Sequence, residues 1–290
     1  MSGPFDYGTM TGRNIGFVTA REQEQLRQGR VFVCGAGGMG GACLQSLARA
    51  GVGAFEIADF DRFEISNLNR QVFSSLDVMG REKTEVTAER LRAIHPGVDL
   101  RVHGAEWVDA LNDILPRCPV VVNGMDDIAA GIRLYRAARA HGATVVDAYS
   151  STLPSVTVVG PGDPRPEERL GFPTVGVGHD AFTPAMLNAC RQAEVEYVLV
   201  HSSTGDTLDM TIAGEILTGK RPRISFAPMV ITTGNLMAYA AIAALIGRTP
   251  PADCRGWFLD PHTGRIERPH TAPVAALRRH AVRRFLASLG

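Results

Sequence analysis

The sequence predicts an α/β protein with a Rossmann-like, mainly parallel sheet and helices on both faces. Two observations support this prediction. Short, continuously apolar runs, such as RVFVC at 30–34 and VVV at 120–122, alternate with helical segments. Strands of this kind are typical of a parallel sheet that is covered on both sides. The first run also ends in a glycine cluster that opens a helix, an arrangement found in nucleotide-binding folds.

The first half of the chain alternates strands and helices. A polar helical arm is expected within residues 16–30, before the first strand. Period and apolar content predict strands at 30–35, 54–61, 99–107, 119–127, 143–151 and 156–160. Helices are expected between them at 37–51, 83–94 and 128–141.

The pattern changes after the sixth strand. Residues 161–173 are rich in proline, glycine and charge, and predict a mobile crossover loop. A helix follows at 183–200, with Thr183 as N-cap and Pro184 at the first helical position. The segment 255–268 is expected to form an antiparallel hairpin. The last stretch, 272–289, predicts an amphipathic helix. One side of that helix carries Val274, Leu277, Ala281, Val282 and Phe285.

One domain is expected over residues 1–290. Residues 1–30 form its N-terminal arm, and 31–160 its nucleotide-binding half. Residues 161–290 are expected to supply the crossover loop, the substrate side of the site and dimer contacts. Antiparallel strands from this half are expected to extend the sheet.

Charge and composition exclude several classes of partner. The 30 basic and 30 acidic residues balance, so no general attraction to DNA or to an anionic membrane is expected. The one membrane candidate, 229–247, is opened by Pro228 and interrupted by polar residues at 232–235. Its longest apolar run, 236–246, is shorter than the roughly 20 residues that a span needs. We therefore predict a buried helix there.

The cysteines and the first residues bear on metal content and location. None of the five cysteines forms a CxxC pair, so no zinc site of paired cysteines and no disulfide framework is expected. The start lacks a basic segment followed by an apolar one, so a signal peptide is not expected. A cytoplasmic location is the resulting expectation.

The glycine cluster is the first candidate site. Gly35, Gly37, Gly38 and Gly40 follow the first strand, and glycine lets a backbone turn tightly and approach a phosphate. Asp59 ends the second strand, where a carboxylate can bind ribose hydroxyls. The motif predicts nucleotide binding but does not choose between NAD, FAD and ATP, and on this motif alone a dehydrogenase would be the default.

A polar cluster beyond the ribose position favours a nucleoside triphosphate. An arginine can hold phosphate oxygens bidentately, and a lysine places a point charge beside them. Asp126 follows the fourth strand at the edge where ligands of such sheets bind, and a single carboxylate there can hold magnesium. The other residues of the cluster are Asp61, Asn67, Arg70, Gln71 and Lys83.

This ordered set, GxGGxG, DxD, NxxRQ, a following GxxK and a later strand ending in Asp, resembles the ThiF/MoeB/HesA adenylyltransferases, relatives of ubiquitin-activating enzymes. The resemblance implies that the glycine loop and Asp59 bind ATP, and that Asn67 and Arg70 hold its triphosphate. It implies that Lys83 steadies the α-phosphate and that Asp126 binds Mg²⁺. Arg13 resembles an arginine that reaches the partner's ATP, so the resemblance also implies a homodimer.

The implied reaction is ATP- and Mg²⁺-dependent activation of a carboxylate as an acyl-adenylate. The substrate is expected to be the C-terminus of a sulfur-carrier or ubiquitin-like protein, a peptide, or a small molecule. The alternatives are an enzyme like the tRNA threonylcarbamoyladenosine dehydratases and a dinucleotide-binding oxidoreductase. Many members carry a cysteine that forms a thioester in the crossover loop; only Cys190 lies near, inside an expected helix, where a buried packing role is favoured.

Overall fold

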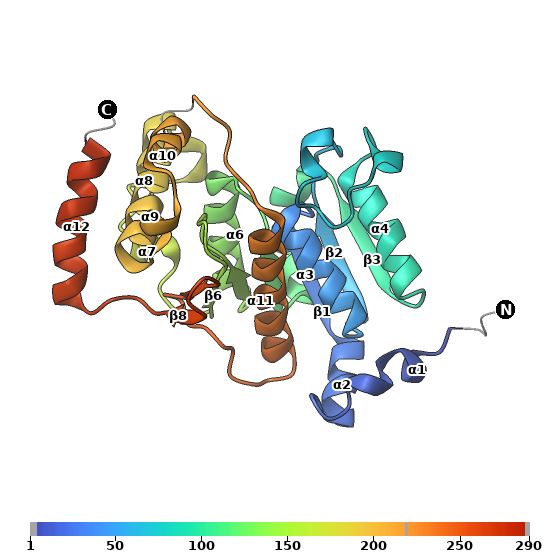
Figure 1. The fold of residues 1–290 in the computed structure, drawn as a ribbon. Helices are drawn as coiled ribbons and strands as arrows, with labels where there is room; N and C mark the ends of the chain where they lie inside the picture. Colours follow the sequence, from blue (N-terminus) through green and yellow to red (C-terminus); the bar gives the residue numbers. More distant parts are fainter. Residues whose placement is uncertain (1–4, 218–219, 288–290) are drawn as a thin grey trace.

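The apolar runs of the sequence form one eight-stranded sheet in the computed structural model, which describes residues 5–217 and 220–287 (Figure 1). The strand order is β3-β2-β1-β4-β5-β6-β7-β8. Pairing is parallel from β3 across to β5, and antiparallel from β5 to β8. The strands are β1 (Arg30–Cys34), β2 (Ala54–Ala58), β3 (Asp99–His103), β4 (Val120–Asn123), β5 (Thr144–Asp147), β6 (Ser155–Val159), β7 (Trp257–Asp260) and β8 (Arg265–Glu267). The predicted fold class is confirmed.

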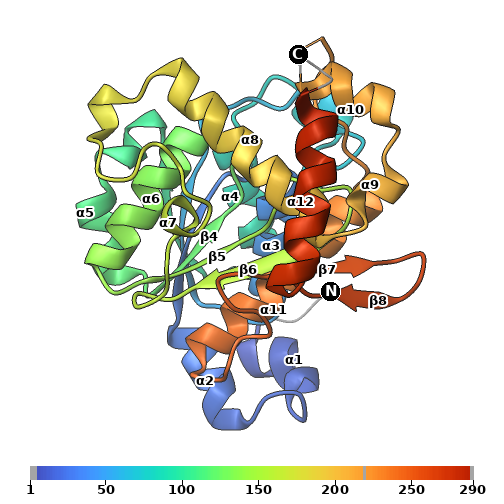
Figure 2. The same cartoon turned by 90° about the vertical axis from the view of Figure 1, so that its left-hand side faces the viewer.

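Helices cover both faces of this sheet (Figures 1 and 2). They are α1 (Tyr7–Thr11), α2 (Ala20–Gln28), α3 (Gly38–Arg49), α4 (Lys83–Ile94), α5 (Leu111–Ile114), α6 (Ile128–Ala140), α7 (Pro166–Arg169), α8 (Pro184–His201), α9 (Thr204–Thr207), α10 (Met210–Leu217), α11 (Ala227–Leu245) and α12 (Ala272–Ala287). As predicted, Thr183 caps α8, because its hydroxyl accepts a hydrogen bond of 3.2 Å from the Met186 backbone N–H.

Alternation along the strands divides the core into two layers. Val31 and Val33 of β1 belong to a cluster with α3, α4 and α11. Phe32 and Cys34 of the same strand point to the opposite face and pack with α5 and α6. Both faces of β1, β2 and β4 are therefore buried, which explains why the sequence shows unbroken apolar runs there rather than alternation.

Four strands end several residues earlier than the sequence suggests, and two of them are β2 and β5, which end at Ala58 and Asp147. β3 ends at His103, and residues 105–108 form a short 3₁₀ turn instead. β4 ends at Asn123, so Asp126 lies on the loop beyond the strand. This loop is what carries Asp126 out over the edge of the sheet.

The apolar helix α11 packs closely on α3. It is the one described helix long and apolar enough to cross a membrane, a test that a core helix passes equally. A side chain at Gly234 would bring its Cβ within 2.5 Å of the Met39 carbonyl and 2.6 Å of the Ala42 Cβ. The two helices approach so closely because small residues line their contact.

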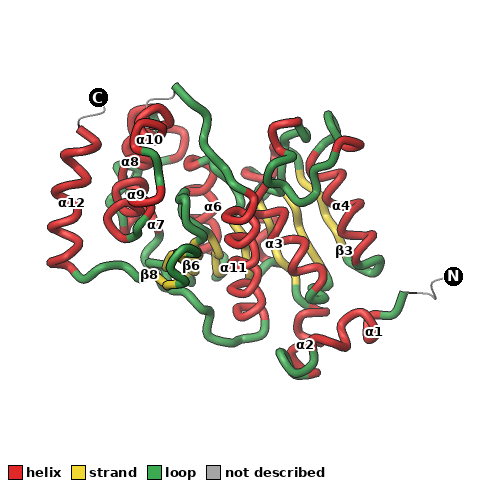
Figure 3. Tube along the Cα trace, viewed as in Figure 1, coloured by secondary structure: helices red, strands yellow, loops and turns green. Residues whose placement is uncertain are grey.

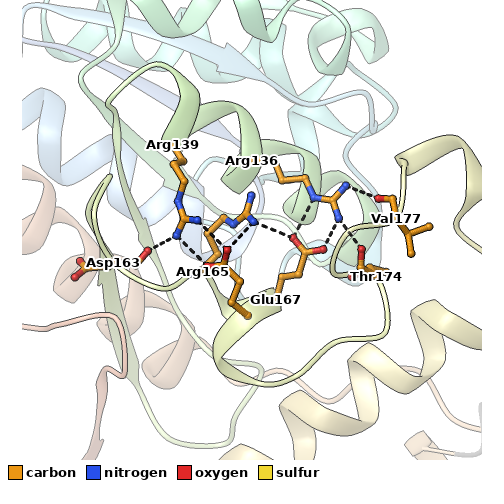
Figure 4. Close-up of polar contacts among 8 residues, drawn as sticks. Arg136, Arg139, Asp163, Arg165, Glu167, Thr174 and Val177 are labelled. Atoms are coloured by element: carbon orange, nitrogen blue, oxygen red, sulfur yellow. Dashed lines mark hydrogen bonds and ion pairs between the residues drawn. The ribbon is translucent and has the colours of Figure 1, made fainter.

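The crossover segment is held more firmly than the prediction of a mobile loop implied. It contains α7, and its Glu167 is only 2% exposed. Arg136 of α6 binds Glu167 through two guanidinium nitrogens and also donates to the carbonyls of Thr174 and Val177, at 2.8 and 2.7 Å (Figure 4). We call this set of contacts the crossover clamp.

The terminal helix α12 presents a different side to the protein than expected. It lies along α8, which Figure 2 shows in the foreground. Arg278 donates to the carbonyls of Leu199 and Ser202, at 3.1 and 2.8 Å. Val274 and Leu277, expected on the apolar contact side, are 45% and 76% exposed. Arg278, a charged residue of the kind usually found on a solvated helix face, therefore helps to dock this helix.

Candidate active site

One cavity of about 610 Å³ runs along the carboxyl ends of β2, β1, β4 and β5. Parallel strands bring their carboxyl ends to the same edge of a sheet, where ligands of such folds bind. The connection from α10 to α11, a long loop in Figure 3, contributes Arg223, Ile224 and Ser225 to the wall. Asn69 Nδ2 holds that loop by donating to the Ser225 carbonyl at 3.0 Å.

The glycine loop between β1 and α3 leaves no room for side chains. Gly35 has φ +86°, a left-handed conformation that favours glycine. A Cβ on Gly40 would lie 1.8 Å from the Gly35 carbonyl oxygen, and one on Gly38 would lie 2.5 Å from Val230 Cγ1. Gly40 is absent from the residues that line the cavity, so its requirement is close backbone packing. Gly37 does line it, immediately before the N-terminus of α3.

Asp59 joins this loop to the end of β2. Its carboxylate accepts hydrogen bonds from the backbone N–H groups of Ala36 and Asp61, at 2.8 and 2.9 Å. Burial raises the pKa of Asp59, against these hydrogen bonds and the nearby Lys83 ammonium, which lower it. The carboxylate is therefore fixed beside the glycine loop, with acceptor capacity left for ribose hydroxyls.

Lys83 and Asp61 form an ion pair inside the cavity. Lys83 is 6% exposed, and its Nζ lies 2.8 Å from Asp61 Oδ2. Its backbone N–H also donates to the Asp61 carbonyl at 2.9 Å. Asp61, predicted as a nucleotide ligand, thus orients the ammonium of Lys83.

The NxxRQ segment lies against the same cavity, but some of its side chains form hydrogen bonds within the segment itself. Asn67 Oδ1 accepts from the Glu64 backbone N–H at 3.1 Å, which stabilises the turn that precedes Arg70. Arg70 Nη1 donates to the Ser66 carbonyl at 2.8 Å. Gln71 is 7% exposed, and its buried Oε1 has no hydrogen-bond partner among the described residues. A buried acceptor without a donor is costly, so this oxygen points to a ligand that donates.

The two acidic residues after β4 have different environments. Asp127 caps α6, because its Oδ1 accepts from the backbone N–H groups of Ala129 and Ala130, at 2.9 and 3.1 Å. Asp126 lines the cavity with 81% of its side chain exposed, and Arg223 Nη1 lies 3.9 Å away. Asp126 is therefore the carboxylate of the pair that is free to meet a ligand.

Arg13 is not brought to this cavity. It lies exposed in a 3₁₀ turn, Gly12–Asn14. The neighbouring Asn14 donates to the Ala50 carbonyl at 3.1 Å, at the C-terminal end of α3. The glycine loop is at the other end of this 12-residue helix, about 18 Å away. Within one chain, Arg13 does not reach the phosphate position.

The structure adds residues that sequence reasoning missed. Asp147 ends β5, and its carboxylate accepts from Tyr135 Oη, Asn123 Nδ2 and its neighbouring backbone N–H, at 2.7, 2.9 and 2.7 Å. Its place at a strand end was the available signal. The remaining additions come from the segment after β5, from α7 and α8, and from the loop before α11, where the sequence carries no recognisable motif: Tyr149, Arg169, Arg191, Glu194 and Arg223.

Cys190 is placed as a packing residue. It is fully buried, in a cluster with Ile132 and Phe172. Burial raises the pKa of its thiol, which keeps the sulfur protonated. A protonated, enclosed thiol does not suit thioester formation.

Comparison with curated proteins finds relatives for part of the chain. A segment of 108 residues is 36% identical to the probable adenylyltransferase/sulfurtransferase MoeZ of Mycobacterium tuberculosis, covering 37% of this chain and 28% of that protein. Another of 81 residues is 42% identical to a sulfur carrier protein adenylyltransferase of Thermus thermophilus, covering 28% and 30%. The chain thus spans less than a third of the length of these two relatives.

Comparison with solved structures finds the same fold over most of the chain. Escherichia coli MccB, solved with ATP, superposes with a TM-score of 0.65 at 18% identity, covering 92% of this chain and 73% of that one. The E. coli tRNA N6-threonylcarbamoyladenosine dehydratase TcdA superposes with a TM-score of 0.59 at 17% identity, covering 83% and 95%. At such identities the likeness shows the fold alone. The match to the ThiF family extends over residues 11–276, and the chain therefore belongs to that family.

Proposed function

We propose that this protein is a nucleotidyltransferase that uses ATP and Mg²⁺ to activate a carboxylate as its acyl-adenylate. The observation that carries the proposal is the nucleotide half of the cavity, at the ends of β2 and β1. There the glycine loop, with its close backbone packing at Gly35 and Gly40, lies beside Asp59 and the buried Lys83. The relatives named as adenylyltransferases support the same activity.

The residues present fit a nucleoside triphosphate. The N-terminus of α3 follows Gly37 and offers free backbone N–H groups and a positive dipole end to phosphate oxygens. Gln71 Oε1 lacks a donor within the described residues. Arg70 and Lys83 line the same wall and supply cations for the triphosphate.

Asp126 fits a magnesium ion that arrives with ATP. The described residues contain no group of three or more His, Cys, Asp or Glu side chains that could form a protein-built metal site. Magnesium in nucleotide sites usually takes only one or two carboxylates, with waters and phosphate oxygens as its other ligands. The exposed carboxylate of Asp126 meets that need, and the bound ion would neutralise charge that develops on the phosphates.

The chemical step needs positioning and cations more than a base. A carboxylate oxygen of the substrate attacks the α-phosphorus, the bond to the β-phosphate oxygen breaks, and pyrophosphate leaves. The carboxylate is already ionised at neutral pH, so no proton has to be removed. Lys83 and Arg70 would stabilise the negative charge that spreads over the phosphate oxygens.

The carboxylate substrate lies beyond the nucleotide in this proposal. The ends of β4 and β5 form the other half of the cavity, roofed by α7 and α8. Sulfur-carrier proteins, peptides and small acids remain the candidate substrates. The adenylyltransferase relatives favour this activity over a dinucleotide-binding oxidoreductase.

Calorimetry and isotope exchange test the proposal. We expect ATP with Mg²⁺ to bind and NAD to bind far more weakly, because the Arg70 and Lys83 cations suit a triphosphate and NAD lacks the γ-phosphate. With a carboxylate substrate present, labelled pyrophosphate should exchange into ATP. Tight NAD binding without ATP binding would contradict the proposed ATP-dependent adenylation.

A further inference from the structure

Arg169 lines the substrate half of the cavity, and two of its three guanidinium nitrogens have no hydrogen-bond partner among the described residues. It comes from the end of α7 and lines the wall beside Tyr149. Its Nη2 donates to Tyr149 Oη at 2.8 Å. Its Nε and Nη1 are buried and have no hydrogen-bond partner, and no carboxylate within the described residues forms an ion pair with it.

Two aromatic rings and the crossover clamp hold this guanidinium in place. Arg169 Cζ lies 4.7 Å from the centroid of the Tyr197 ring and 5.8 Å from that of Tyr149. Both tyrosine hydroxyls donate to the Arg255 carbonyl, at 2.8 and 2.9 Å, which fixes the rings. Glu167, two residues before Arg169, is gripped by Arg136 (Figure 4). The unpaired N–H groups are therefore preorganised.

The local charge balance favours an anion at this point. Arg191 and Arg223 line the same half of the cavity. The carboxylate of Asp147 is already satisfied by its three donors. Glu194 also lines this half, and burial, followed by the charge of Asp147, raises its pKa to about 7, so its negative charge is only partly present at neutral pH.

A charged guanidinium N–H donor forms a strong hydrogen bond with a carboxylate oxygen. A buried charged donor without an acceptor is costly, so a ligand that supplies one gains affinity. The carboxylate to be adenylated must lie near the α-phosphate, over β1 and β4, whereas Arg169 lies over the end of β5. Two strand spacings, about 10 Å, separate β1 from β5, so one carboxylate cannot occupy both positions.

We propose that Arg169 is the specificity-determining residue for an acyl substrate that carries a second carboxylate. This inference rests on the proposed adenylation and names its substrate class. The second carboxylate belongs to a small dicarboxylic acid or to the acidic last residue of a peptide. Arg169 touches that distal carboxylate and takes no part in the bond that forms at the phosphorus.

Matched pairs of acids and amides test this proposal. The probes are glutarate against its monoamide, Gly-Asp against Gly-Asn, and Gly-Glu against Gly-Gln. The readouts are pyrophosphate exchange and calorimetric binding in the presence of ATP. In at least one pair we expect the diacid to bind ten times more tightly or better than its amide. The pair that responds distinguishes a free acid from a peptide terminus.

Variants assign the effect to Arg169. Arg169→Gln should raise KM for the preferred diacid roughly 10- to 100-fold, the range expected for lost hydrogen bonds between charged groups. The KM values for its amide and for ATP should stay within a factor of about two, because those ligands do not use this guanidinium. Arg169→Lys keeps the charge without the planar array of donors, and its KM should fall between those of the native protein and Arg169→Gln. The control is Arg90→Gln. Arg90 is an exposed arginine of α4 that pairs with Asp77, and its substitution should change none of these values.

The outcomes separate the two proposals. Absence of ATP binding overturns the proposed function itself. If ATP binds but none of the six probes binds, or amides bind as well as diacids, the second-carboxylate subsite is wrong. The same holds if Arg169→Gln keeps the native melting temperature and the native preference for the diacid.

Discussion

At the scale of single residues, Asp126 and Asp127 show how one position decides a role. Both follow β4, yet Asp127 is consumed by the backbone N–H groups that open α6, whereas Asp126 faces the cavity. Of the two, only Asp126 keeps a carboxylate that a metal bound to ATP could use in our proposal. The difference arises because α6 begins at Ile128, so Asp127 occupies the N-cap position directly before it.

We expect Asp126→Asn to keep the fold and much of the ATP affinity but to lose adenylation by a factor of ~10² or more. The physical reason is that a metal supplies several kcal/mol of charge stabilisation in the transition state. Asp127→Asn should cost only about 0.3–1 kcal/mol of stability, because asparagine still caps the helix. Pyrophosphate exchange and a melting curve for each variant check this. If Asp127→Asn lost pyrophosphate exchange while Asp126→Asn kept it, our assignment of Asp126 as the metal ligand would be wrong.

Glu194 should make stability depend on pH. Its pKa is raised from 4.5 to about 7, first by burial and then by Asp147, while Arg223 and Arg169 act in the opposite direction. Above pH 4.5 the folded chain therefore holds this proton more tightly than the unfolded chain. Its contribution to stability falls as pH rises from 4.5 to 7 and is constant above that range.

Glu194→Gln removes this dependence, because glutamine does not ionise. We expect the variant to gain stability relative to the native protein between pH 5 and pH 8, by on the order of 1–3 kcal/mol. Urea unfolding at several pH values measures the difference. A constant difference across that range would show that Glu194 keeps an ordinary pKa.

At the scale of elements, the crossover clamp turns a segment without a motif into part of the cavity wall. Arg136 reaches Glu167, Thr174 and Val177 from α6, so one side chain ties α7 to the residues that follow it (Figure 4). Arg139 adds contacts to Glu168 and to the Asp163 carbonyl. The α7 wall of the substrate half is therefore tied to α6, the helix that follows the loop carrying Asp126.

Arg136→Met should destabilise the fold by about 3 kcal/mol or more, because the buried carboxylate of Glu167 loses both of its guanidinium hydrogen bonds and keeps only Arg165 Nη2, 3.9 Å away. Arg139→Met is the matched control, since its partner Glu168 is 31% exposed and keeps Arg165, and it should cost clearly less. Hydrogen exchange of residues 161–177 and urea unfolding measure both effects. Adding Glu167→Leu to Arg136→Met should restore part of the loss. Equal costs for the two arginines would argue against the clamp.

At the scale of the whole molecule, the N-terminal arm lies at the end of α3 that is far from the cavity. α1 and α2 sit apart from the cavity edge in Figures 1 and 2. Beside Arg13, the arm exposes Ile15 to 51% and Phe17 to 84%. Exposed apolar side chains of this kind are typical of a contact surface. They support our proposal that a second copy of the chain covers the arm and receives Arg13 in its site.

Mixed dimers test this proposal. Arg13→Ala and Asp126→Ala should each be inactive as pure proteins, because every site lacks one group. Mixing the two chains should restore activity, since one of the two hybrid sites has both an intact Asp126 and an arginine from its partner. Sedimentation verifies that heterodimers form, and pyrophosphate exchange measures the recovery. Verified heterodimers without recovery would contradict a shared site.

What the sequence determined by itself is the nucleotide half and the fold class. Buried parallel strands, the glycine loop and the caps of α6 and α8 are each encoded within a few neighbouring residues, so periodicity and residue type reveal them. Asp59, Lys83 and Asp126 follow or open those same elements, and the topology of a parallel sheet carries them to one edge. Their catalytic roles stay predictions.

What only the tertiary structure decided is the substrate half. Arg169 meets Tyr149 and Tyr197, which lie 20 and 28 residues away along the chain, and nothing near any of them in sequence signals that contact. The inward side of α12 was predicted only in part: Val282 and Phe285 are half-buried, but Val274 and Leu277 are exposed, and Arg278 docks the helix on α8 instead. Such contacts depend on how distant helices are placed against one another, and that placement is a property of the packed chain rather than of any short segment.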